Sequence, residues 1–202
     1  CAGEWGGSAE DLGCGCNEAA RSGCDETCGS TAVVDDCGVC GGDGTTCLAT
    51  LSLGAFDSSG SLEILYDFGS DILGFQFDVS GLALSSASGG AAGDAGFMVS
   101  VGDDSVLGIS LTGGTISAGS GVLTVLSFSD ITADATELSL GNSGAVVSSD
   151  GSTTLDLSFE GSIDHGDQDC AGSYYGDAWE SDCGCVDADN SGDDCDDCAG
   201  TP

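Results

Sequence analysis

All 13 cysteines of this chain lie outside residues 48–163: eight lie in residues 1–47 and five in 164–202. Cytosolic thiols are kept reduced, so this number of cysteines favours a secreted or cell-surface protein. Short segments cannot bury a sufficient core and need disulfides, metal ions or both. We therefore expect a cysteine-free central domain, 48–163, between two arms, 1–47 and 164–202, stapled by disulfides and metal.

The arms contain internal repeats. The tripeptide Cys-Ala-Gly begins at Cys1, Cys170 and Cys198. A second cysteine follows 13 residues after Cys1, after Cys24 and after Cys170, at Cys14, Cys37 and Cys183. This spacing predicts three copies of one small module and a truncated fourth that starts at Cys198.

Structural disulfides are the favoured role for these cysteines. Zinc is the weaker alternative, because the chain has one histidine and its arms are crowded with carboxylates rather than with compact four-ligand sets. The five cysteines of the second arm cannot all pair among themselves, which leaves open a bond to a neighbouring chain or to a partner outside this sequence. The residues predicted to form disulfides are Cys1, Cys14, Cys16, Cys24, Cys28, Cys37, Cys40, Cys47, Cys170, Cys183, Cys185, Cys195 and Cys198.

The charge of the chain is extremely one-sided. There are 35 acidic residues and a single basic one, Arg21, which gives a net charge of −34. Without a basic patch, nucleic acid and anionic membrane surfaces are excluded as partners, and no stretch is apolar enough to predict membrane insertion. A divalent cation, Ca²⁺ above all, is the expected counterion. The alternative is an acidic surface that only keeps the protein soluble.

The acidic run from Asp187 to Asp193 is the sharpest candidate for a calcium site. It fits the D-x-D-x-S-G start of a calcium loop, with Asp187, Asp189, Ser191 and Asp193 as oxygen ligands. The twelfth position is Cys198, so Asp196 or Asp197 would have to complete the shell. A solvated acidic loop is the alternative. Weaker candidates of the same kind are Asp35, Asp36 and Asp43 in the first arm, and Asp164, Asp167 and Asp169 in the second.

Two segments of the arms resemble known calcium-binding sequences. Residues 35–47, DDCGVCGGDGTTC, resemble the cysteine- and aspartate-rich repeats of large secreted bacterial surface proteins, which are similar in style to thrombospondin type 3 repeats. Residues 187–193 resemble half of a dockerin calcium loop, although the paired second loop and its helices are missing. The resemblance implies calcium-binding repeats in both arms.

The central domain shows the period-two alternation of half-buried strands. Clusters of Gly, Ser and Asp at 58–61, 87–94, 112–121 and 141–152 predict the turns between them. With no amphipathic helix, the pattern predicts an all-β, nine-stranded, jelly-roll-like antiparallel sandwich. The nine expected strands lie in 51–53, 62–66, 75–79, 97–101, 106–111, 122–128, 138–140, 146–147 and 155–159.

Three of these strand segments resemble the cohesin-like domains of bacterial extracellular proteins. They are ILGFQFDV at 72–79, VLGISL at 106–111 and GVLTVLSF at 121–128. The resemblance implies a nine-stranded jelly-roll sandwich that recognises dockerin modules or serves as a structural bead.

No catalytic constellation stands out in the sequence. His165, the one histidine, lies in an Asp- and Gly-rich linker without a Gly-x-Ser-x-Gly elbow, and there is no lysine. Trp5, Tyr174, Tyr175 and Trp179 could stack on sugar rings, but packing in place of a missing core is favoured.

The sequence therefore predicts a protein that is not an enzyme. The favoured function is a structural subunit of an extracellular filament or surface layer, joined head-to-tail to copies of itself through calcium-binding, disulfide-rich arms. The alternative is a cohesin-like or carbohydrate-binding adhesion module of a larger secreted protein, with extracellular glycans as partners.

Overall fold

A computed structural model describes residues 13–15 and 18–193 of the chain. The chain forms two compact units, Cys1–Leu48 and Ala49–Pro202. Within the described residues, no helix has the length and apolar character required to cross a bilayer.

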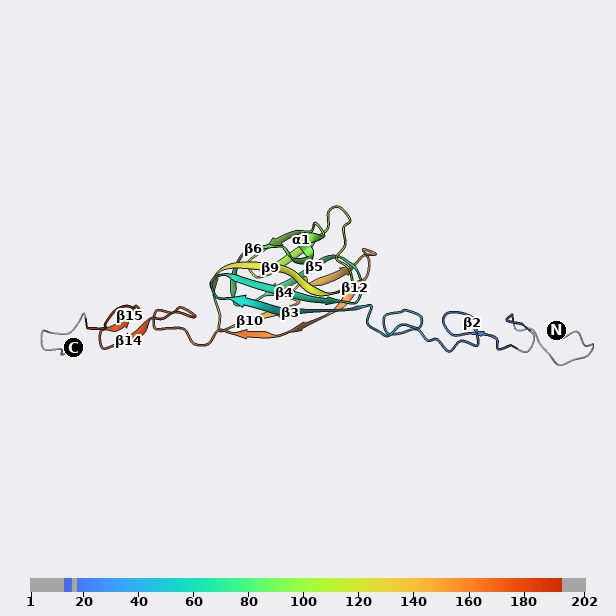
Figure 1. Cartoon of the computed structure of the whole chain (residues 1–202), viewed down its shortest axis with the longest axis horizontal. Helices are drawn as coiled ribbons and strands as arrows, with labels where there is room; N and C mark the ends of the chain where they lie inside the picture. Colours follow the sequence, from blue (N-terminus) through green and yellow to red (C-terminus); the bar gives the residue numbers. More distant parts are fainter. Residues whose placement is uncertain (1–12, 16–17, 194–202) are drawn as a thin grey trace, which may run out of the picture. The chain divides into compact units, whose positions relative to one another are not determined.

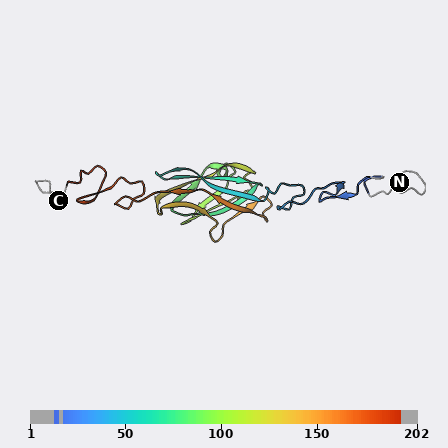
Figure 2. The same cartoon turned by 90° about the horizontal axis from the view of Figure 1, so that it is seen from below.

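The second unit is built on a β-sandwich (Figures 1 and 2). One layer has the order β6 (Leu82–Ser88), β9 (Gly119–Ile131), β4 (Ser61–Phe68) and β3 (Leu48–Asp57). The other has the order β7 (Met98–Val101), β8 (Ser105–Ile109), β5 (Ile72–Val79), β11 (Ala145–Ser148) and β12 (Thr154–Glu160). β12 also neighbours β3, while β10 (Ala135–Ser139) pairs with the end of β5 and with β13 (Ser162–Asp164).

The core lies between the layers and follows the period-two pattern of the sequence. Leu62 and Ile64 in β4 and Phe75 and Phe77 in β5 are buried, because alternate side chains of a strand point to the same face. β9 departs from strict alternation: Ile64 of β4 pairs with Thr124 and Leu65 pairs with Val122, so Leu123 is an extra residue that forms a β-bulge in β9. Both Leu123 and Thr124 of β9 are fully buried at this bulge.

Thr124 shows how the core tolerates a polar side chain. Its hydroxyl donates a hydrogen bond of 3.3 Å to the carbonyl oxygen of Ser88. A buried hydroxyl without a partner would cost free energy, so this bond makes the position acceptable.

The predicted all-β antiparallel sandwich is confirmed, and each of the nine expected strands overlaps a strand of the structure. Two strands of the large sheet, β6 and β13, were not predicted. The cluster expected to be a turn at 87–94 holds the end of β6 and a five-residue helix, α1 (Gly90–Asp94). Its Ala92 is fully buried, so tertiary packing and not helix propensity explains this helix.

The first unit has little regular structure. β1 (Arg21–Ser22) pairs with β2 (Thr27–Cys28), and Val34 forms an isolated bridge with Cys40. Among its described residues, three overlapping disulfides close the loops: Cys14–Cys28, Cys24–Cys40 and Cys37–Cys47. These covalent links take the place of a hydrophobic core.

The second arm has the same character. The hairpin of β14 (Trp179–Ser181) and β15 (Gly184–Val186) is tied back by the Cys170–Cys185 disulfide. Cys183 is disulfide-bonded as well. Cys1, Cys16, Cys195 and Cys198 lie outside the described residues.

Candidate functional site

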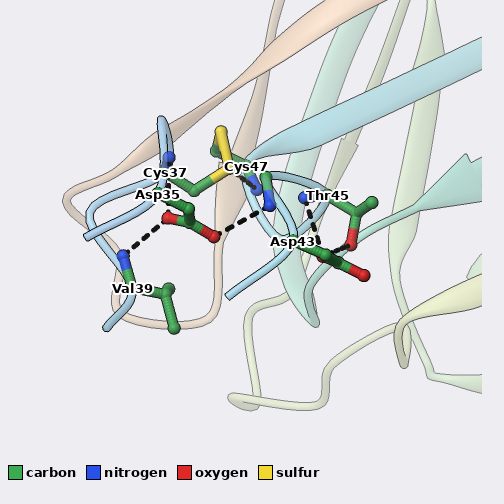
Figure 3. Close-up of a disulfide and its surroundings, with 7 residues drawn as sticks. Asp35, Cys37, Val39, Asp43, Thr45 and Cys47 are labelled. Atoms are coloured by element: carbon green, nitrogen blue, oxygen red, sulfur yellow. Dashed lines mark hydrogen bonds between the residues drawn. A yellow bond between two sulfur atoms is a disulfide. The ribbon is translucent and has the colours of Figure 1, made fainter. Parts of the chain in front are cut away.

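The first arm contains a loop organised around the carboxylate of Asp35 (Figure 3). Its Oδ1 accepts hydrogen bonds from the backbone N–H groups of Cys37 (3.0 Å) and Val39 (2.8 Å), and its Oδ2 accepts one from Gly44 (2.9 Å). The bonds from Val39 and Gly44 are the main causes that hold the pKa of Asp35 below its ordinary value. The Cys37–Cys47 disulfide closes the same loop.

Asp43 organises the next turn of this loop. Its Oδ1 accepts hydrogen bonds from the hydroxyl of Thr45 (2.7 Å) and from the backbone N–H of Thr45 (3.1 Å). Both bonds lower the pKa of Asp43, and the bond from the Thr45 hydroxyl has the larger effect. The geometry is an Asx-type turn, which fixes the backbone without any ion.

The second arm contains the same loop around Asp169. Its Oδ1 accepts a hydrogen bond from the backbone N–H of Ser173 (2.8 Å) and its Oδ2 accepts one from Ala178 (3.1 Å). These donors lie four and nine residues after the aspartate, the same offsets as those of Val39 and Gly44 from Asp35. The bond from Ser173 is the main cause that lowers the pKa of Asp169.

The backbone bonds of the two loops match as well. Asp35 N–H donates to the Val39 carbonyl oxygen at 2.9 Å, and Asp169 N–H donates to that of Ser173 at 3.0 Å. Gly38 N–H donates to the Asp35 carbonyl oxygen at 3.0 Å, and Gly172 N–H donates to that of Asp169 at 2.9 Å. Asp35 and Asp169 therefore occupy equivalent positions in two copies of one loop.

A glycine seven residues after each aspartate is required by this geometry. A Cβ atom at Gly42 would collide with the carboxylate of Asp35, and one at Gly176 would collide with that of Asp169. The sequence signal is Asp-x-x-Gly-x-x-x-Gly-Asp, present at 35–43 and 169–177. Cysteine spacing did not reveal this register, because Cys37 is equivalent to Ala171 and Cys170 to Asp36.

The two loops differ at the positions of Cys40 and Gly41, which Tyr174 and Tyr175 occupy in the second arm. The backbone at Gly41 has φ 69° and that at Tyr175 has φ 56°. A left-handed backbone costs a residue other than glycine about 1–2 kcal/mol. Tyr175 takes this conformation while its hydroxyl lies 3.0 Å from Nδ1 of His165.

His165 fastens this loop to the sandwich. Its side chain is 4% exposed, its Nε2 lies 2.8 Å from Oγ1 of Thr136, and its backbone N–H donates to the carbonyl oxygen of Asp134 at 2.7 Å. Its ring lies 5.1 Å from that of Phe56 and 5.7 Å from that of Tyr175. We call His165, Thr136, Tyr175 and Phe56 the His165 anchor.

The anchor is a structural arrangement. Burial is the main cause that lowers the pKa of His165 and favours the neutral ring, against an opposing effect of Asp164. Thr136 is fully buried, so its hydroxyl is out of reach of a substrate. The sequence pattern around His165 did not predict this role, since both ring partners come from distant positions.

The predicted calcium ligands at 187–193 form a turn. Asn190 N–H donates to the carbonyl oxygen of Asp187 at 2.9 Å, and the backbone of Gly192 has φ 80°. Trp179 packs against this turn, because a Cβ at Gly192 would lie 2.7 Å from the Trp179 ring. Gly192 at the sixth position thus supports a sharp turn, as a calcium loop needs.

The carboxylates of this run are not gathered around one point. Within 13–15 and 18–193, no three His, Cys, Asp or Glu side chains form a group that could hold a metal ion. Asp196 and Asp197 lie outside the described residues. Calcium binding by Asp187, Asp189, Ser191 and Asp193 stays a prediction.

The remaining predicted ligands have other surroundings. Asp35, Asp43 and Asp169 are engaged by the loop hydrogen bonds described above, and Asp164 accepts a bond of 2.8 Å from the backbone N–H of Gly166. Asp36 and Asp167 are exposed.

No known protein family and no curated protein matches the chain by sequence. Solved structures that resemble its fold include two cohesins. One is a non-cellulosomal cohesin from the hyperthermophilic archaeon Archaeoglobus fulgidus. It is 15% identical, the match covers 55% of this chain and 86% of the cohesin, and the TM-score is 0.40. The second is the sixth cohesin of scaffoldin B from Acetivibrio cellulolyticus, in complex with a Cel5 dockerin mutant. It is 18% identical, the match covers 58% of this chain and 98% of the cohesin, and the TM-score is 0.43.

Both are cohesin modules, the family that the strand motifs of the central domain resemble.

Proposed function

We propose that this chain is a structural module of an extracellular assembly, in which the sandwich is a bead and the arms are its joints. The observation that carries the proposal is the recurrence of one carboxylate-centred loop on both sides of the sandwich in the sequence, around Asp35 and around Asp169. Serial repeats of one small unit are typical of chains that stack end to end.

The covalent structure of the arms supports an extracellular location. Four disulfides have Cα–Cα distances between 5.2 and 5.7 Å, within the normal range for such bonds. Bonds of this kind persist in oxidising compartments.

The charge of the chain supports a cation-dependent assembly. Copies with a net charge of −34 repel one another, so contact between them requires neutralisation. We propose Ca²⁺ for this role, bound through the oxygen-bearing side chains of the 187–193 turn. A head-to-tail contact between two different surfaces would give an open filament.

Electron microscopy and light scattering of the oxidised protein would test this proposal, with Ca²⁺ and then with a chelator. We expect filaments in Ca²⁺ that loosen or dissociate on chelation. Monomers at high concentration in both conditions would refute the filament.

A charge-matched pair of variants separates a specific calcium site from general screening. Asp187→Asn, Asp189→Asn and Asp193→Asn together should raise the Ca²⁺ concentration needed for assembly. Asp94→Asn, Asp103→Asn and Asp104→Asn remove the same charge from exposed positions of the sandwich and should not raise it. Equal responses would show that Ca²⁺ acts by screening alone.

A second candidate function, a binding module on the sandwich, is favoured by one feature of the second layer. Met98 of β7 and Leu107 of β8 are 48% and 38% exposed. Met98 pairs with Ile109, and Leu107 pairs with Ser100, so the side chains of Met98 and Leu107 lie on the same face of the sheet. Exposed apolar side chains on one face are typical of partner-binding surfaces. Saturable binding by a protein that stays monomeric would favour this function over the filament.

A further inference from the structure

The arm and the sandwich enclose a polar crevice of about 470 Å³ within the second unit. One wall is the β3–β4 turn with the end of β9, and the other is the Asp169 loop. The volume falls in the range of small-ligand sites, about 300–1,000 Å³.

The crevice is lined mainly by neutral hydrogen-bonding groups. Hydroxyl and amide side chains dominate it, and Asp130 is its one charged residue. The polar lining includes Ser58, Ser129, Thr132, Gln168, Ser173 and Tyr174.

The lining excludes several classes of ligand. Anions would meet Asp130 and no cation, so phosphates, sulfates and uronates are disfavoured. A purely apolar ligand would leave the hydroxyl and amide groups without partners, which costs free energy. A divalent ion needs more carboxylates than this crevice offers.

A neutral ligand with many hydroxyl groups meets every requirement of this lining. Hydroxyl and amide side chains both donate and accept hydrogen bonds, as sugar hydroxyls do. The aromatic ring of Tyr174 adds an apolar surface for the C–H face of a sugar. Its hydroxyl donates a long hydrogen bond of 3.5 Å to Oδ1 of Asp134. We propose that the crevice binds a neutral saccharide.

The comparison of the two loops supports this site. The backbone of the Asp35 loop is repeated around Asp169, but Val39 and Cys40 are replaced by Ser173 and Tyr174. Both replacements line the crevice, and both add a hydroxyl group. The loop that lines the crevice therefore carries hydroxyl groups that the Asp35 loop lacks at the same two positions.

The site goes beyond the proposed structural role and does not depend on assembly. Binding would be measured by NMR titration of the oxidised protein in chelator, with light scattering to record its state. The probes are maltotriose, cellotriose, mannotriose and triacetylchitotriose, with trigalacturonic acid as the anionic control. We expect at least one neutral trisaccharide to bind with a dissociation constant on the order of 1 mM. The anionic control should not bind.

Two variants test the two walls separately. Thr132→Val on the sandwich side and Gln168→Ala on the arm side each remove one hydrogen-bonding group, and each should weaken binding by about five- to tenfold. Both residues are exposed, so neither change threatens the fold. Thr112→Val, an exposed position between β8 and β9 that does not line the crevice, is the control and should leave binding unchanged.

Three results would overturn the proposal. They are no shift with any neutral trisaccharide, equal binding of the anionic control, and binding that either Thr132→Val or Gln168→Ala leaves intact. Filament formation without saccharide binding would reject this inference alone, and saccharide binding without filaments would reject only the assembly role.

Discussion

Asp35 and Asp169 accept a hydrogen bond of 2.8 Å from the backbone N–H four residues later, and a second from the N–H nine residues later. Each carboxylate therefore ties together a loop that has no hydrophobic core. Because the donors are backbone groups, the side chains of the loop are free to vary, as Cys40 and Tyr174 do at equivalent positions. One scaffold can thus carry a disulfide in one arm and a tyrosine in the other.

Replacing Asp35 by asparagine should loosen the first loop. The amide group of asparagine can accept through one oxygen only, so the N–H of Val39 or that of Gly44 loses its partner. We expect faster hydrogen exchange at these two amides. Asp36→Asn is the control, because it removes the same charge from an exposed neighbour. Equal exchange rates in both variants would contradict this role for Asp35.

Replacing Tyr175 by phenylalanine should weaken the His165 anchor. The change removes the hydroxyl that lies 3.0 Å from Nδ1 of His165 and keeps the ring and the left-handed backbone. We expect a loss of about 1 kcal/mol in the free energy of unfolding, the usual contribution of one hydrogen bond. Chemical denaturation would measure it, and an unchanged free energy would show that the hydroxyl contributes nothing.

Replacing Gly108 by alanine should destabilise the sandwich. A Cβ at this position would collide with the ring of Phe75, which is buried in the core. Overpacking of this kind costs about 1–3 kcal/mol. Gly93→Ala is the control, since nothing lies within 4 Å of a Cβ there. Phe75→Leu should partly rescue Gly108→Ala in the double variant; additive losses would contradict the proposed collision.

The stability of the second unit should fall as the pH is lowered from 8 to 5, through the ordinary His pKa of about 6.5. Burial lowers the pKa of His165 in the folded state. Below pH 6.5, His165 is therefore protonated in the unfolded chain while it is still neutral in the folded chain. The contribution of His165 is therefore present at neutral pH and lost on acidification.

The comparison with His165→Gln isolates this effect. Other titratable groups near the ring are the carboxylates of Asp164 and Asp134 and the phenols of Tyr174 and Tyr175, and the variant keeps all four of them. The stability advantage of the native protein over the variant should shrink as the pH falls. A constant difference would show that His165 does not titrate differently on folding.

The sequence alone determined the class of the central fold. Alternating apolar residues such as Leu62, Ile64, Phe75 and Phe77 fix which face of each strand is buried, and that information is local. The sequence missed β6 and α1, because small residues such as Ala92 give no strong periodicity. Their structure depends on packing against other strands.

Only the tertiary structure decided which polar residues act together. The sequence does not indicate that His165, Thr136 and Tyr175 contact one another, because these contacts join residues 10 to 29 positions apart. The equivalence of Asp35 and Asp169 was hidden by cysteines at shifted positions and became visible through backbone hydrogen bonds. Residue spacing specifies local conformation, whereas the contacts that build the anchor and the crevice arise when distant segments fold against one another.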